Sequence, residues 1–248
     1  MKAHKRVHTP MLAVLVVAAI ASVAAAKAAT ASKLPELPIS YVVCPTGKSI
    51  PLQAGVTYQA SKFPIALRLT PPDGSWSGGQ WKTASGGCDA AGGGFAGYPP
   101  YYGWVAFGHG SGVRPPRGSV VISTSYGQTP TAATAVNRLR NGLPRNEATY
   151  QPTTRTRLAG FYGYQFDGKI VGERHIFLPF TKPGGAIGGG PDAIEFEAGW
   201  VFRIIVLNVR GKTVIVYVTS ATLPANQFPG FLNQANRILR TLAFPKGA

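Results

Sequence analysis

Residues 201–219 read VFRIIVLNVRGKTVIVYVT, with Arg210 and Gly211 between two runs of β-branched and other apolar side chains. Two such runs separated by a pair of turn residues are typical of a β-hairpin. Both runs are apolar at nearly every position, as expected for strands that are covered on both faces. We therefore predict strands at 200–209 and 212–219, at the centre of a sheet.

The rest of the chain beyond Ser32 shows short strand patterns broken by turn residues. Charged residues are only 14% of the sequence, against about 25% in an average protein, while it contains 31 Gly and 21 Pro. This composition indicates many turns and short strands. Nine further strands are predicted, at residues 39–44, 56–60, 65–70, 103–107, 119–124, 155–159, 162–166, 170–178 and 193–197.

Two segments show helical patterns. The first is 131–141, with Thr129 as a candidate cap, Pro130 in the first turn and Gly142 as the stop. The second is 228–242, where apolar residues recur every three or four positions and so form one buried helix face. These residues are Phe228, Leu232, Ala235, Leu239 and Leu242.

The order of these patterns repeats along the chain. Gly103-Trp104-Val105, Val120-Val121-Ile122 and Asn137-Arg138-Leu139-Arg140 have counterparts 93–100 residues later. We predict an α+β fold with twisted antiparallel sheet structure and one helix per half packed on a face. The halves are 39–142 and 143–248, and an internal duplication is an open alternative.

The N-terminus has the three parts of a secretory signal peptide. Lys2, Lys5 and Arg6 precede an apolar stretch from residue 11 to 23, which ends in three alanines, 24–26. We predict a signal peptide at 1–26, a linker at 27–38 and a secreted or extracytoplasmic protein. An uncleaved segment would be a membrane anchor, but residues 11–26 are shorter than the roughly 20 needed to cross a bilayer.

Charge and cysteine content fit that location. The formal net charge is +16, and removal of residues 1–26 takes away only three basic residues. A basic surface is attracted to polyanions. The basic residues are scattered and form no nucleic-acid motif, so no specific nucleic-acid partner is expected. Cys44 and Cys88 are the two cysteines, and an even count in an exported chain predicts one structural disulfide.

A cluster of aromatic residues gives the candidate ligand site. Aromatic side chains on a stapled, glycine-rich loop could stack on sugar rings or on an apolar partner, while basic side chains contact anionic groups. The alternative is that the rings cover the edge of the sheet as part of the core. The predicted ligand-binding residues are Trp76, Trp81, Tyr98, Tyr101, Tyr102, Lys82 and Arg114.

The sequence offers few candidates for covalent chemistry. His109 and Ser111 are too close in sequence to form a catalytic pair, and the histidines lack the spacing of a metal site. Glu195 and Glu197 would place two carboxylates about 7 Å apart on one face of a strand, a separation suited to glycoside hydrolysis. The simpler interpretation is a half-buried strand with Ile194 and Phe196 inward.

The closing part of the chain resembles a known group of proteins. The hairpin at 200–219 leads through a proline-containing loop into a helix that ends in Ile-Leu-Arg-Thr-Leu-Ala-Phe, residues 238–244. This pattern, over about residues 158–245, resembles the secreted PsbP-like and LpqN-like α/β sandwich proteins. Leu52–Tyr58, Phe63–Thr70 and Gly74–Trp76 are similar to exported proteins of high-GC Gram-positive bacteria. The resemblance implies a scaffold and leaves the chemistry open.

These observations predict an exported binding or scaffolding protein of the cell envelope that performs no catalysis. Its expected partner is an anionic envelope polymer, a glycan or a membrane surface. No cofactor and no metal are expected, and the oligomeric state stays open. The alternative function is a wall-directed hydrolase that uses Glu195 and Glu197.

Overall fold

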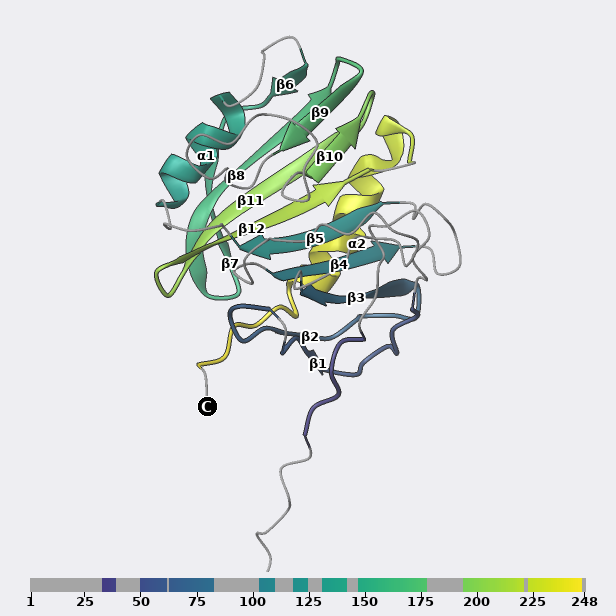
Figure 1. The fold of residues 1–248 in the computed structure, drawn as a ribbon. Coiled ribbons are helices and arrows are strands. Elements are labelled where there is room, and N and C mark those ends of the chain that lie inside the picture. The colour runs from purple at the N-terminus through teal and green to yellow at the C-terminus, as the bar shows by residue number, and fades with distance from the viewer. Residues whose placement is uncertain are drawn as a thin grey trace, which may run out of the picture. The chain divides into compact units, whose positions relative to one another are not determined.

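The computed structural model describes residues 33–38, 50–61, 63–82, 103–109, 118–124, 131–141, 147–177, 194–220 and 223–246. The chain divides into two compact units, Met1–Leu34 and Pro35–Ala248, and every element below belongs to the second. Within it, eight antiparallel strands form the main sheet (Figure 1). Their order is β3 (Trp76–Lys82), β4 (Gly103–His109), β5 (Ser119–Thr124), β12 (Lys212–Thr219), β11 (Val201–Val209), β8 (Phe161–Ile170) and β6 (Ala148–Tyr150), with β7 (Thr154–Leu158) also paired to β8.

The hairpin β11–β12 lies inside this sheet, as the sequence predicts. Its two-residue turn is Arg210-Gly211, with φ angles of +51° and +77°. Positive φ at both central residues gives a turn whose twist matches that of the flanking strands. β11 pairs on its other side with β8, and β12 pairs with β5, so neither strand is at an edge. All residues from Thr213 to Thr219 are buried.

The central pairing joins the two predicted halves in one sheet. β5 lies in residues 39–142 and β12 in 143–248, and Ile122 is opposite Val216. Ser119 and Thr219 also share a hydroxyl hydrogen bond of 2.7 Å across this pair. The fold is therefore α+β, with strands from both halves in a single antiparallel sheet.

Alternate residues of the central strands point into two separate cores. On one face, Val120, Ile122 and Val216 pack against α2 (Phe228–Leu239), through Phe231, Ala235, Ile238 and Leu239. The short antiparallel pair β1 (Tyr58–Gln59) and β2 (Arg68–Leu69) adds Tyr58 and Leu69 to the same core. A 3₁₀ turn, Ala225–Gln227, leads into α2.

On the other face, Val121, Ile215 and Tyr217 pack against α1 (Ala132–Asn141). The hairpin of β9 (Arg174–Phe177) and β10 (Ile194–Glu197) covers the rest of this core through Phe196, which is 1% exposed. Phe196 lies 5.4 Å from Phe202 and 6.2 Å from Tyr217, between ring centroids. The two helices therefore lie on opposite faces of the sheet, with α2 behind it in Figure 1.

The helix boundaries follow the sequence with small corrections. α1 begins one residue later than predicted and ends at Asn141 as predicted, while α2 ends at Leu239 rather than at residue 242. Thr131, not Thr129, supplies the α1 cap, because its hydroxyl oxygen accepts a hydrogen bond of 3.2 Å from the Thr134 amide. Thr129 lies outside the described residues.

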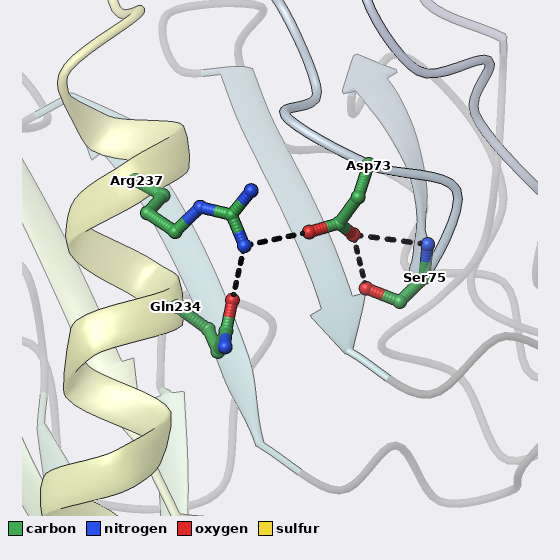
Figure 2. A network of polar contacts seen from close by, with 4 residues as sticks. All are labelled: Asp73, Ser75, Gln234 and Arg237. Atoms are coloured by element: carbon green, nitrogen blue, oxygen red, sulfur yellow. Dashed lines mark hydrogen bonds and ion pairs between the residues drawn. The ribbon is translucent and has the colours of Figure 1, made fainter.

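A polar network ties the segment before β3 to α2 (Figure 2). One carboxylate oxygen of Asp73 accepts hydrogen bonds from the amide and hydroxyl of Ser75, and the other lies 3.0 Å from the Arg237 guanidinium. Arg237 also donates a 3.0 Å hydrogen bond to the side-chain oxygen of Gln234. Because the Asp73 and Arg237 side chains are 34% and 48% exposed, this ion pair contributes less than about 1 kcal/mol.

Candidate functional site

The structure places only part of the predicted aromatic site. Trp76 is 0% exposed at the start of β3, with its ring centroid 6.4 Å from that of Phe231 on α2. It is therefore a core residue, as the alternative interpretation proposes. Trp81 and Lys82 lie at the end of β3, where Trp81 is opposite Trp104 on β4. Outside the described residues lie Tyr98, Tyr101, Tyr102, Arg114, Cys44 and Cys88.

The predicted carboxylate pair lies on β10. Phe196 is buried while Glu197 is exposed, which is the alternation of a half-buried strand. Glu197 is opposite Arg174 in the β9–β10 register, and Glu195 is opposite Ile176. The buried Phe196 between them fixes the hairpin on the sheet, so this strand has a clear packing role.

A surface that the sequence analysis did not single out lies on the β7–β8 hairpin. Ala159 and Gly160 form its two-residue turn, with φ angles of +52° and +85°. This turn fixes the register, in which Leu158 is opposite Phe161 and Arg157 is opposite Tyr162. Figure 1 shows this turn beside that of β11–β12, at the lower left of the sheet.

One face of this hairpin carries two arginines and an exposed tyrosine. Arg155 and Arg157 are both exposed, and Tyr162 is 73% exposed. The Arg157 guanidinium lies 5.2 Å from the centre of the Tyr162 ring, a cation–π distance. We call Arg155, Arg157 and Tyr162 the arginine face. Tyr164, opposite Arg155, is half-buried and packs against the α1 core.

The opposite face of the hairpin anchors it to the molecule. Leu158 and Phe161 pack against the α2 core, and Phe161 makes an edge contact with Phe244 at 5.8 Å. Arg210 holds the same region by donating hydrogen bonds to the carbonyl oxygens of Phe244 and Pro245. The arginine face is therefore presented on a hairpin whose other side is fixed by packing.

The charges near the arginine face are unbalanced. Asp167, the acidic residue on β8, points to the α2 side of the sheet and is bound by Arg203 through two hydrogen bonds of 2.7 Å. The side-chain hydrogen bond to Asp167 raises the pKa of Arg203, so this guanidinium keeps its positive charge. Among the side chains that the structure describes, Arg155 and Arg157 form no ion pair. Two positive charges are thus exposed without a carboxylate partner among the described residues.

Arg140 provides a contrast, because it is used inside the fold. Its guanidinium lies 5.4 Å from the ring centre of Tyr150 and 5.6 Å from that of Phe166, and it donates to the Thr153 hydroxyl. Burial raises the pKa of Tyr150 to about 12 and outweighs the opposing effect of the Arg140 charge. The Tyr150 hydroxyl is therefore neutral at pH 7, and the cluster joins α1 to β6 and β8.

The turn of the β7–β8 hairpin allows a direct test of its local stability. Ala159 adopts a left-handed conformation that costs an alanine roughly 1 kcal/mol or more, whereas Asn tolerates it. Ala159→Asn is expected to raise the free energy of unfolding by about 0.5–1 kcal/mol in urea denaturation. Gly160→Ala, at φ +85°, should lower it by about 1 kcal/mol. A loss of stability in the Asn variant would contradict the assigned turn.

No family model matches the chain, and no curated protein matches it. No helix in the part of the chain that the structure describes has both the length and the apolar character needed to cross a membrane. The assignment of function therefore rests on the residues themselves.

Proposed function

We propose that this chain is an exported, non-catalytic binding or scaffolding protein of the cell envelope that recognises an anionic surface. The arginine face is the observation that carries the proposal. Its two exposed arginines form no ion pair with a described side chain, and the other side of their hairpin is fixed by packing. Removal of the three basic residues within 1–26 lowers the formal net charge from +16 to +13, which gives the same preference over the exported chain.

The mechanism has a long-range and a short-range part. The positive charge of the chain attracts it to a polyanion. At about 0.1 M salt this attraction is largely screened beyond a separation of about 10 Å. At contact, the planar guanidinium groups of Arg155 and Arg157 can each donate two parallel hydrogen bonds to a phosphate or carboxylate. Tyr162 restrains Arg157 by lying under its guanidinium, which reduces the ordering cost of binding.

A competing explanation for the two arginines is protection of the sheet edge. β7 pairs with β8 on one side, and charged side chains on edge strands discourage association with other chains. That role would make Arg155 and Arg157 matter for solubility but leave ligand affinity unchanged. The two roles therefore differ in a binding measurement.

The test compares two variants that each lose two positive charges. Arg155→Gln/Arg157→Gln is expected to weaken binding to vesicles rich in anionic phospholipid by about tenfold, since each exposed contact is worth up to about 1 kcal/mol. The matched control, Arg138→Gln/Arg240→Gln, removes exposed arginines from α1 and from the end of α2. It should change affinity by less than about threefold. Equal losses of affinity in both variants would show that binding depends on net charge and not on the arginine face, and would overturn the proposal.

We propose a second contact at the aromatic residues that the sequence analysis predicts. Trp81 and Lys82 end β3, and with Tyr98, Tyr101, Tyr102 and Arg114 they would add stacking and anion contacts for a glycan. Trp76 is left out because it is buried. We further propose that residues 1–26 are removed on export and that Cys44 and Cys88 form a disulfide. We also propose that the fold is the PsbP-like and LpqN-like scaffold.

We also propose that the two halves arose by duplication, with one helix each. β3, β4, β5 and α1 follow the same order as β8, β11, β12 and α2, and the two strand sets meet at Ile122 and Val216, which are 94 positions apart. The opposite placement of the helices requires one of them to have changed faces. The sequence repeat matches Trp104 with Trp200, whereas in the sheet Val105 and Ile205 occupy matching positions, opposite Ile122 and Val216. The duplication therefore also requires a shift of register between the two halves.

A further inference from the structure

The two arginines of the arginine face have a defined repeat along β7. Arg155 and Arg157 are two residues apart on one strand, so their side chains leave the same side of the sheet. Two residues of extended strand span about 7 Å. This distance corresponds to six covalent bonds along an extended backbone. A ligand that contacts both arginines while lying along β7 should therefore carry anionic groups about 7 Å apart.

Phosphodiester polymers differ in this repeat according to the carbons between their phosphates. With a three-carbon linker, as in a 1,3-linked glycerol phosphate chain, successive phosphorus atoms are separated by six bonds and lie about 7 Å apart when extended. A five-carbon linker adds two bonds and lengthens the repeat to about 9 Å. In inorganic polyphosphate only two bonds separate the phosphorus atoms. The three-carbon linker therefore matches the strand.

We propose that the arginine face binds a linear polymer of the 1,3-glycerol phosphate type, with one phosphodiester on Arg155 and the next on Arg157. This inference rests on the proposed function and specifies its ligand. Each guanidinium presents a planar fork of N–H donors that fits two oxygens of one phosphodiester. The polymer runs along β7, and the adjacent Tyr162 ring supports Arg157 from below.

The surface fits a phosphate chain better than a single-stranded nucleic acid, which has the same three-carbon linker. Proteins that bind single strands stack successive bases on several exposed rings. Here Tyr162 is the exposed ring, and the Arg157 guanidinium lies over it. Tyr164, two residues further along β8, is half-buried against the α1 core. No second platform for a base is therefore present among the described residues of this hairpin.

The experiment measures affinity for polymers of equal phosphate number but different linkers. Fluorescence anisotropy would compare labelled 1,3-glycerol phosphate oligomers, 1,5-ribitol phosphate oligomers, inorganic polyphosphate and single-stranded DNA at one salt concentration. The glycerol phosphate oligomer is expected to bind about threefold or more tightly than the ribitol phosphate oligomer. A single glycerol phosphate should bind at least tenfold more weakly than the oligomer, because it can contact only one arginine.

Single substitutions test whether the preference for the three-carbon linker comes from the arginine face. Arg155→Gln and Arg157→Gln should each abolish the preference for the three-carbon linker, because each leaves a single guanidinium on the strand. Arg138→Gln should keep the preference. The slope of log affinity against log salt should become less steep by about 0.7 for each lost phosphate contact.

The possible failures are distinct. Equal affinity for all four polymers, lost in the double variant, would overturn the repeat-matching inference and leave the proposed anionic binding intact. Tighter binding of DNA than of glycerol phosphate would assign the surface to nucleic acid and also overturn the inference. No measurable binding to any polyanion or anionic vesicle would overturn the proposed function itself.

Discussion

Replacing Phe202 with alanine is expected to lower the free energy of unfolding by about 3–5 kcal/mol. Phe202 is 0% exposed on β11, and its ring centroid lies 5.4 Å from that of Phe196 and 6.2 Å from that of Tyr150. It is opposite Gly168 on β8, and a Cβ atom placed on that glycine would lie 2.4 Å from the Phe202 ring. The ring therefore fills the space above Gly168 and holds Phe196 in place.

The measurement is urea denaturation followed by tryptophan fluorescence and circular dichroism. Tyr162→Ala is the matched control, because it removes an aromatic ring from the neighbouring strand where 73% of the residue is exposed. It should change stability by less than about 0.5 kcal/mol. Similar losses in the two variants, or a loss below 1 kcal/mol for Phe202→Ala, would contradict the assigned core.

Part of this fold can be predicted from local sequence alone. β11 and β12 are apolar on both sides, and the structure places cores on both faces, with α1 and β10 on one side and α2 on the other. The predicted strand 119–124 is confirmed as β5 with the same bounds. These segments were predictable because their own residues combine strand composition with a clear turn or helical period.

β3 was missed because its residues carry a weak local signal. Residues 76–82 include Ser77, two adjacent glycines at 78 and 79, and Gln80, a composition typical of a loop. The strand forms because each residue pairs with β4, from Trp76 opposite His109 to Lys82 opposite Gly103. The pairing of β5 with β12, about 94 positions apart, likewise depends on the whole fold rather than on either segment.

The arginine face has a local signal in the sequence. Residues 154–157 alternate Thr and Arg, and Tyr162 and Tyr164 are two residues apart on the next predicted strand. Only two residues, Ala159 and Gly160, separate the strands, so the short turn alone sets Arg157 opposite Tyr162. The exposure of the ring can be seen only in the structure, as can the lack of a carboxylate partner among the described residues. Strand alternation directs Asp167 to the other face.

Gly118→Ala is the second substitution expected to have a large effect, with a loss of about 3 kcal/mol in the free energy of unfolding. Gly118 precedes β5 and has a φ angle of +115°, a backbone conformation that residues other than glycine rarely adopt. A Cβ atom there would also lie 2.7 Å from the Phe231 ring of α2. The alanine therefore carries both a backbone cost and a steric clash that displaces α2 from the sheet.

Two further variants separate these costs. Gly211→Ala, at φ +77° in the β11–β12 turn, has no atom within 4 Å of its new Cβ and should lose only about 1–2 kcal/mol from the backbone term. Phe231→Leu removes the opposing ring, so its loss and that of Gly118→Ala should add to more than the loss of the double variant. Strict additivity, or equal losses at Gly118 and Gly211, would show that Phe231 does not lie over Gly118. Gly118 and the Phe231 ring would then be independent, and the assigned close approach of α2 to the start of β5 would be wrong.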